Sequence, residues 1–244
     1  YVSIENARLN MNTEQPGFDF DKVRTAASTM WNKDLSKVQV EGGTKDEKTI
    51  FYTGMYHLLI HPNILQDVNG EYPMMESLKV GHTTGNRYTV FSLWDTYRNV
   101  STLMTLLYPE RQLDIIRTML DMYRENGWLP KWELYGRETF TMEGDPSIPY
   151  IVDAWMRGLR DFDEQTAYEA MRKGAVLPGA ENLLRPDNDD YLSLGYVPLR
   201  EQYDNSVSHA LEYYIADYAL YTLAKSMGKK EDADLFYKRS MGYK

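Results

Sequence analysis

Residues 92–127 read SLWDTYRNVSTLMTLLYPERQLDIIRTMLDMYRENG, and this stretch decides the fold. Ser92 can cap a first helix, Pro109 suits the first turn of a second, and Gly127 suits the position just beyond its end. Apolar residues recur at helical spacing through the second segment, which indicates one buried face. They are Leu113, Ile115, Ile116, Met119, Leu120, Met122 and Tyr123. The stretch therefore predicts a helical hairpin.

Helical patterns continue on both sides of this hairpin. Thr44 can cap a helix whose first turn is acidic and which Pro62 stops. The predicted helices cover residues 20–31, 44–61, 148–159, 163–173, 204 or 205 to 227, and 229–243. Long loops are expected at 62–88 and 174–203. Because strand-like patterns are short and few, the sequence predicts a mainly α protein.

A weak internal repeat suggests how these helices are arranged. Asp95, Asp153 and Asp217 each stand beside aromatic residues in a predicted helix, spaced about 60 residues apart. That period fits one helical hairpin with its loop, which favours hairpins stacked around a common axis as a toroid. Residues 1–18 start with β-branched and aromatic residues and then turn polar, so we expect a short strand or linker there and the helical part from residue 19 to 244.

The composition of the chain excludes several classes of function. The 244 residues are 43% hydrophobic and 26% charged, so the chain can bury a sizeable core and is not a disordered segment. Its formal net charge of −9 argues against a nucleic-acid or anionic-membrane partner, because such surfaces need concentrated Lys and Arg. No apolar run approaches the roughly 20 residues of a membrane span. With no Cys, the chain has no disulfide, thiol nucleophile or zinc ribbon.

Both ends of the chain suggest that it is part of a longer polypeptide. It begins at Tyr1 without a charged and then apolar leader, and it finishes inside an amphipathic helical pattern with no Gly or Pro stop beyond it. We therefore expect a fragment of a larger protein.

The most conspicuous chemical constellation combines carboxylates with indole rings. Trp94 and Asp95 lie in SLWDTYR, Lys131 and Trp132 lie in GWLPKW, and Glu138 follows shortly after. Aromatic faces stack on the C–H face of a sugar ring, while carboxylates and ammonium groups hydrogen-bond its hydroxyls. The alternative is that Trp94 belongs to the core and Asp95 is an acid favoured in the first turn by the helix dipole.

His57 and His61 are four residues apart on one predicted helix, as metal ligands can be. The Glu that follows the first His in a zincin is missing, since residue 58 is Leu, and Pro62 ends the helix directly after His61. A core or interface role is favoured for both histidines, and no metal ligand is assigned in this chain.

Two acidic groups have plain structural explanations. Asp187, Asp189 and Asp190 lack the Gly and the downstream Glu of a calcium loop, so a solvated turn is favoured. Glu143 and Asp145 precede a predicted helix, where they form either a loop carboxylate pair or, as we favour, a helix cap.

In their order and spacing, several blocks of the sequence resemble the α-mannosidases of glycoside hydrolase family 92. The blocks are FYTGMYHLLIHPNILQDVNGEY, YTVFSLWDTYR, PERQLDIIRTMLDMYRENGWLPKW, GRET and LGYVP with NSVSHALEYYIADYALYTLAKSMGK. The resemblance covers nearly the whole chain. It implies an exo-acting, calcium-dependent, inverting hydrolase that removes terminal α-mannose, with the site between a β-sandwich and an (α/α)6 barrel. Residues 1–18 would then end the sandwich, and 19–244 would form the first part of the barrel.

The resemblance also implies roles for individual residues. Asp95 would bind hydroxyls of the terminal mannose in a pocket shaped by Trp94, with Lys131 and Trp132 lining it and Glu138 supporting it. The family's general acid, its bases and most of its calcium ligands would lie beyond Lys244, so the isolated chain is expected to bind sugar without turning it over. The expected partners are a mannose-containing glycan and the rest of the parent polypeptide, which would pack against this segment, in a bacterial periplasmic, extracellular or cell-surface setting.

The sequence departs from the family pattern close to the expected pocket. Many members read GNETNCMIGYH where this chain reads GRETFTMEGDPS, so the linkage preference and even an atypical mannoside or a mannosyl phosphate stay open. Two other functions are open as well. One is a non-catalytic carbohydrate-binding relative on the same helical barrel, and the other is a different α/α toroid enzyme such as a lyase or phosphorylase.

Overall fold

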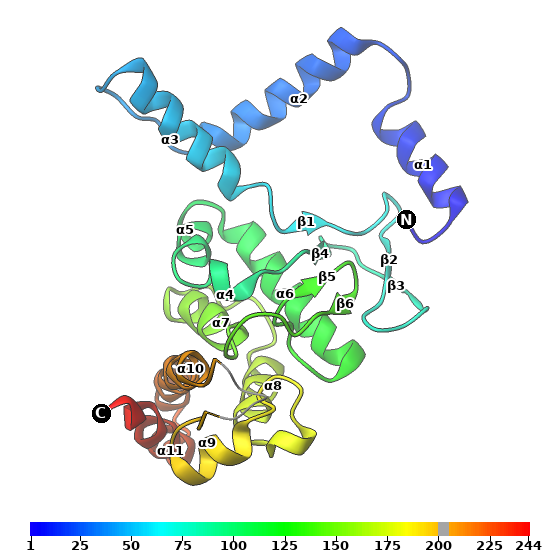
Figure 1. Ribbon diagram of the computed structural model, residues 1–244. Helices are drawn as coiled ribbons and strands as arrows, with labels where there is room; N and C mark the ends of the chain where they lie inside the picture. Colours follow the sequence, from blue (N-terminus) through cyan, green and yellow to red (C-terminus); the bar gives the residue numbers. More distant parts are fainter. Residues whose placement is uncertain (200–204) are drawn as a thin grey trace. The chain divides into compact units, whose positions relative to one another are not determined.

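The computed structural model describes residues 1–199 and 205–244 (Figure 1). The chain divides into two compact units. The first comprises Tyr1–Pro73 with Leu78–Thr89, and the second comprises Met74–Ser77 with Val90–Lys244. The expected division between residues 18 and 19 stays a prediction.

The first unit has three helices and two small antiparallel strand pairs, β1 with β4 and β2 with β3. Its elements are α1 (Ile4–Glu14), α2 (Phe20–Leu35), α3 (Lys45–Leu58), β1 (Asn63–Ile64), β2 (Glu71–Pro73), β3 (Val80–His82) and β4 (Tyr88–Thr89). Thr44 caps α3 as predicted, in a reciprocal capping box with Glu47. The predicted loop at 62–88 thus contains short strands.

The short strand expected within residues 1–18 is wrong, because α1 occupies most of that segment. Ser3 caps the helix by accepting a hydrogen bond from the backbone of Asn6. Asn6 and Asn10 then donate side-chain hydrogen bonds of 2.8 and 2.7 Å to the carboxylate of Asp67, which is 2% exposed. These distant polar contacts, which local β propensity does not reflect, favour the helix.

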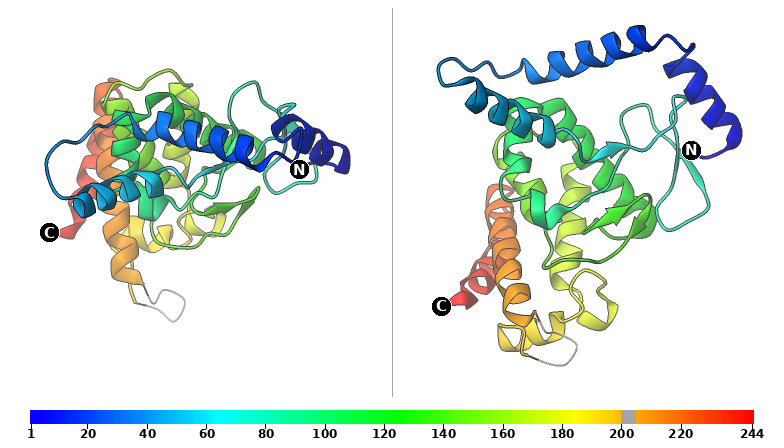
Figure 2. Two further views of the ribbon diagram at one scale, coloured as in Figure 1. Left: turned by 90° about the horizontal axis from the view of Figure 1, so that it is seen from above. Right: turned by 45° about the horizontal axis from the view of Figure 1, so that its top comes forward.

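The second unit holds most of the buried apolar side chains and is mainly helical. Its elements are α4 (Leu93–Thr96), α5 (Val100–Leu107), α6 (Pro109–Asn126), β5 (Glu133–Leu134), β6 (Arg137–Glu138), α7 (Ser147–Met156), α8 (Glu164–Val176), η1 (Gly179–Glu181), α9 (Asn188–Leu194), α10 (Ser206–Ser226), α11 (Lys230–Ser240) and η2 (Met241–Tyr243). Helices α10 and α11 pack side by side as a hairpin, and α10 also packs on α7 (Figures 1 and 2). The predicted mainly α class built from helical hairpins is confirmed.

The hairpin that decides the fold is present with one difference. Pro109 begins α6, and Gly127 ends it with a left-handed φ of 85°. The first helix, however, is broken into α4 and α5. At the break, Tyr97 and Arg98 both donate hydrogen bonds to Glu212 on α10, at 2.8 and 2.5 Å. Long-range polar contacts therefore accompany the interruption of a pattern that reads locally as one helix.

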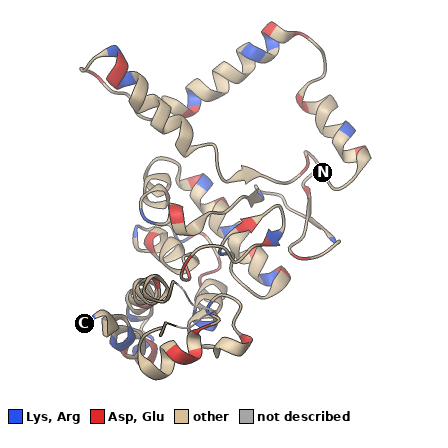
Figure 3. Ribbon diagram, viewed as in Figure 1, with Lys and Arg blue, Asp and Glu red and all other residues tan. Residues whose placement is uncertain are grey.

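The predicted loop at 174–203 is wrong in part, since it contains η1 and α9. Asn205 occupies the N-cap position of α10, whereas Asp204, the other predicted start, lies outside the described residues. Basic and acidic residues are scattered along the described helices (Figure 3). Within the described ranges, no helix combines the length and the apolar character needed to cross a bilayer.

Candidate functional site

A hairpin in the second unit, formed by β5 and β6, carries Glu138, and Lys131 and Trp132 come directly before it in the chain. Strands β5 and β6 pair through a turn at Tyr135 and Gly136, whose φ values of 51° and 83° are those a type I′ turn requires. The Glu138 carboxylate accepts hydrogen bonds from the backbone N–H groups of Lys131, Trp132 and Phe140, at 2.7, 2.8 and 2.8 Å. Glu138 therefore holds the backbone that presents Lys131 and Trp132.

Removing the Glu138 carboxylate should loosen this loop selectively. In Glu138→Ala the three N–H groups, those of Lys131, Trp132 and Phe140, lose a charged acceptor that contributes about 1.5–3 kcal/mol per bond. We expect their amide hydrogen exchange to accelerate about tenfold or more. Glu138→Gln keeps one oxygen acceptor and should give a smaller change. Equal exchange in wild type and Glu138→Ala would contradict a supporting role for this carboxylate.

A second acid, Glu133, joins the hairpin to the segment that leads into α4. Its side chain is fully buried, and its carboxylate accepts hydrogen bonds from the N–H groups of Val90 (3.0 Å) and Gly136 (2.6 Å). Its carbonyl oxygen also accepts a hydrogen bond from the N–H of Phe91, at 2.9 Å. The sequence analysis missed Glu133, because no local pattern marks a carboxylate that accepts a hydrogen bond from the backbone of Val90, which is 43 residues away.

Trp94 and Asp95 lie on the short helix α4. The Trp94 side chain is half-buried and Asp95 is exposed, with Ser92 donating a hydrogen bond to the Asp95 carboxylate. The guanidinium of Arg98 stacks over the Trp94 ring, 5.0 Å from its centroid. The indole N–H groups of Trp94 and Trp132 are buried and lack a hydrogen-bond partner among the described residues. Trp94 is thus neither a fully buried core residue nor saturated with polar partners.

Lys131 is the most unusual group of the site. Only 3% of it is exposed, yet its ammonium makes no hydrogen bond or ion pair with any residue in the described ranges. Burial lowers the pKa of Lys131, although nearby carboxylates act in the opposite direction. These carboxylates belong to Asp145, Glu143, Asp187 and Glu138. A buried cation without a direct partner is costly, so this group is suited to a ligand that supplies oxygen atoms.

The burial and the partners of the acids around Lys131 differ from what the sequence predicted for them. Asp145 does not cap α7 with its side chain; it is 2% exposed and forms an ion pair with Arg185 at 3.3 Å. Asp187 is 1% exposed rather than solvated, and Tyr213 donates a 2.6 Å hydrogen bond to it. Only Asp189 of that acidic group is exposed. The pattern of acids in a loop could not predict this burial, because it does not show that a buried cation such as Arg185 lies beside them.

A buried chain of alternating charges lies behind this cluster. Arg185 has a fully buried side chain and bridges Asp145 to Asp217, whose carboxylate is 3.1 Å away. Asp217 in turn pairs with Arg239 at 2.7 Å and accepts a hydrogen bond from Tyr191 at 2.9 Å. Burial raises the pKa of Asp145, and Arg185 and Lys131 act against that shift. The chain of charges fixes the loop before α7 against α10 and α11.

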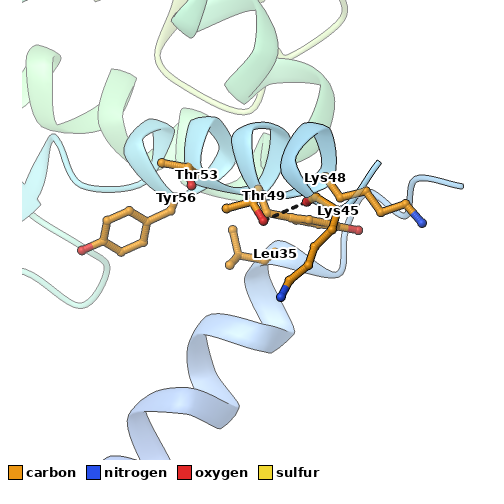
Figure 4. Close-up of a pocket in the computed structure, with 7 residues that line it drawn as sticks. Leu35, Lys45, Lys48, Thr49, Thr53 and Tyr56 are labelled. Atoms are coloured by element: carbon orange, nitrogen blue, oxygen red, sulfur yellow. Dashed lines mark hydrogen bonds between the residues drawn. The ribbon is translucent and has the colours of Figure 1, made fainter. Parts of the chain in front are cut away.

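One groove lies in the first unit and carries none of the predicted site residues. It has a volume of about 730 Å³ and is lined by Leu35 of α2 and by one face of α3 from Lys45 to Tyr56 (Figure 4). Its lining has no carboxylate. His57 and His61 contribute to no metal-binding group, since the described residues contain no cluster of three or more His, Asp or Glu suited to a metal ion. The chemistry therefore centres on the second unit.

Comparison with known proteins gives a consistent result. The sequence model of the glycosyl hydrolase family 92 catalytic domain matches residues 6–244. A protein of Arthroderma benhamiae described as an uncharacterized secreted glycosidase is 27% identical over 98% of this chain and 28% of its own length.

Two solved structures from Bacteroides thetaiotaomicron are similar to this chain. One is a family GH92 α-mannosidase, 35% identical with a TM-score of 0.88 over 99% of this chain and 32% of that one; it has also been solved in complex with mannoimidazole. The other is described as a family GH92 inverting mannosidase, 32% identical with a TM-score of 0.92 over 100% of this chain and 33% of that one. The chain thus spans about a third of the length of these relatives.

Proposed function

This chain belongs to glycosyl hydrolase family 92, and on that premise we propose that the protein carrying it removes terminal α-linked mannose from glycans by an inverting mechanism. The observation that carries the proposal is the nearly buried ammonium of Lys131, which has no direct partner among the described residues and lies beside Trp132 among carboxylates. A sugar offers the hydroxyl oxygens that this ammonium lacks. The mannosidase relatives, one of them in complex with mannoimidazole, support mannose as the sugar.

The proposed roles follow the surroundings of each side chain. Asp95 is exposed and accepts hydroxyl donors, with Trp94 shaping the pocket wall. Lys131 donates to sugar oxygens, and Trp132 offers a ring face together with an indole N–H. Glu138 acts through the backbone that it holds. These are binding and positioning roles.

We assign the proton-transfer steps to residues outside this chain. An inverting glycosidase needs a general acid and a general base about 6.5–9.5 Å apart, with room for the attacking water. The Glu138 carboxylate accepts hydrogen bonds from three backbone N–H groups and the Asp187 carboxylate accepts one from Tyr213, so both already have partners within this chain. Because the described residues contain no metal-binding group, no calcium ligand is assigned here, and calcium dependence remains a property proposed for the longer protein.

The packing partner and the location are also proposals. Helix α10 exposes an apolar stripe at Val207, Leu211, Ile215 and Tyr218, with exposed fractions from 41% to 70%. We propose that the rest of the longer polypeptide covers this stripe, since the relatives are about three times the length of this chain. The description of one relative as secreted favours a site of action outside the cytoplasm.

Proton NMR of α-1,2-mannobiose tests the activity. The full-length protein should first release β-mannose, lose that activity on chelation of calcium, and regain it when calcium is restored. This chain alone should bind the sugar without turnover. Initial release of α-mannose would contradict inversion, and turnover by the chain alone would contradict the placement of the acid and base elsewhere. Binding by the full-length protein without turnover would favour the non-catalytic carbohydrate-binding alternative.

A further inference from the structure

The imidazole of His209 lies between two carboxylates. Its Nε2 is 2.6 Å from Oε2 of Glu143, and its Nδ1 is 3.2 Å from Oδ2 of Asp187. The side chains of His209 and Glu143 are 16% and 14% exposed, and that of Asp187 is fully buried. The His209 ring thus contacts both acids and fixes where the Glu143 side chain lies.

The backbone holds Glu143 in this position. Gly144 has a left-handed φ of 71°, and a Cβ added there would lie 2.4 Å from the Cβ of Glu212. Only glycine allows the loop to approach α10 so closely at this φ. Because Glu212 lies one turn after His209 on α10, the same helix contacts the loop at Gly144 and at Glu143.

This arrangement has a consequence for Lys131. The carboxylates of Glu143 and Asp187 both act on its charge, yet neither forms an ion pair with it. Glu143 is paired with His209, Asp187 with His209 and Tyr213, and Asp145 with Arg185. Each acid near Lys131 thus has another partner, and its ammonium is left for a ligand. Without the contact to His209, Glu143 would be free to pair with Lys131 instead.

We propose that Glu143 is a further substrate-binding residue and that His209 is its positioning residue. Held by His209, the Glu143 carboxylate accepts a hydrogen bond from one sugar hydroxyl while the Lys131 ammonium donates to a neighbouring one. An acceptor and a donor at adjacent positions match a vicinal diol, so the pair contributes to the choice of sugar. This inference rests on the proposed glycan hydrolase function.

Steady-state kinetics on α-1,2-mannobiose with the full-length protein tests the proposal. Glu143→Gln and His209→Gln should each lower kcat/KM about tenfold or more, mainly through KM, because a charge-assisted hydrogen bond contributes about 1.5–3 kcal/mol. His209→Lys restores a cation beside Glu143 and should recover most of the loss. Unchanged KM in Glu143→Gln would overturn the binding role, and failure of His209→Lys to recover activity would overturn the positioning role.

A measurement on this chain alone distinguishes failure of this inference from failure of the proposed function. Glu143→Gln should shift the ¹⁵N signal of His209 Nε2, because these two side chains are in direct contact. An unchanged Nε2 signal would overturn the inference whether or not the protein cleaves mannosides. Inactive full-length protein in which the Nε2 signal does shift would instead count against the proposed function.

Discussion

Replacing Arg185 by methionine is expected to lower the free energy of unfolding by about 3–5 kcal/mol, because breaking a buried ion pair leaves its partner charged and desolvated. Arg185 is fully buried, bridges Asp145 and Asp217, and stacks over Tyr213 at 4.6 Å. Asp217 keeps Arg239 after the substitution, whereas Asp145 loses its ion pair with Arg185. Urea denaturation of this chain, followed by far-ultraviolet circular dichroism, measures the loss.

An exposed arginine provides the matched control for this substitution. Arg117 pairs with Asp114 and Asp161 at 3.0 and 2.7 Å, but its side chain is 42% exposed. Arg117→Met should change stability by no more than about 1 kcal/mol. Adding Asp145→Asn to Arg185→Met should cost less than the sum of the two single changes, because the unpaired charge is then removed. Equal effects of the buried and exposed substitutions would contradict this account.

Lys131→Met is expected to weaken mannoside binding about 100-fold while leaving the fold intact, since a charged donor contributes about 1.5–3 kcal/mol per hydrogen bond. The folded protein should become no less stable, because the ammonium that is removed is nearly buried and has no direct partner among the described residues. Titration of this chain with methyl α-mannoside, with thermal unfolding alongside, measures both quantities.

The pH dependence of stability follows from the same residue. Since burial lowers the pKa of Lys131 in the folded state, the unfolded state binds more protons over the interval between the two pKa values. Stability should therefore rise with pH across that interval in wild type, and this contribution should be missing in Lys131→Met.

Lys173 offers a contrasting lysine. Its ammonium donates to the carbonyl of Gly127 at 2.7 Å and lies 4.2 Å from the centroid of the Trp128 ring. Lys173→Met should cost about 1 kcal/mol of stability and leave sugar binding unchanged. Loss of binding in this variant, or its retention in Lys131→Met, would contradict the assignment of the pocket to Lys131.

The sequence predicted those parts of the fold whose signals are local. Pro109, Gly127 and Thr44 mark helix ends through backbone conformation and capping, which depend on a few neighbouring residues. The α1 helix and the break after α4 were missed, since their polar partners lie far away in the chain. Asp95, Asp153 and Asp217 are not equivalent either: the first is exposed and the last is fully buried.

The site was predicted in a similarly uneven way. The structure joins the segment before α4 to the hairpin that carries Lys131 and Trp132, in keeping with the two motifs singled out in the sequence. For the acids that surround Lys131, the sequence favoured a helix cap or a solvated turn, because the preference of acids for turns and helix starts is strong and local. Burial of Asp187 and Asp145 depends on Arg185 and Tyr213, whose positions no spacing rule provides.

The three N–H groups held by Glu138 have a consequence for how this loop can evolve. The carboxylate accepts hydrogen bonds from the main chain of residues 131, 132 and 140, and their side chains take no part in these bonds. Substitutions at those positions can therefore alter what the loop presents without dismantling its frame, provided that residue 138 stays acidic. Libraries randomised at 131, 132 and 140 should accordingly yield folded variants far more often than libraries randomised at 138.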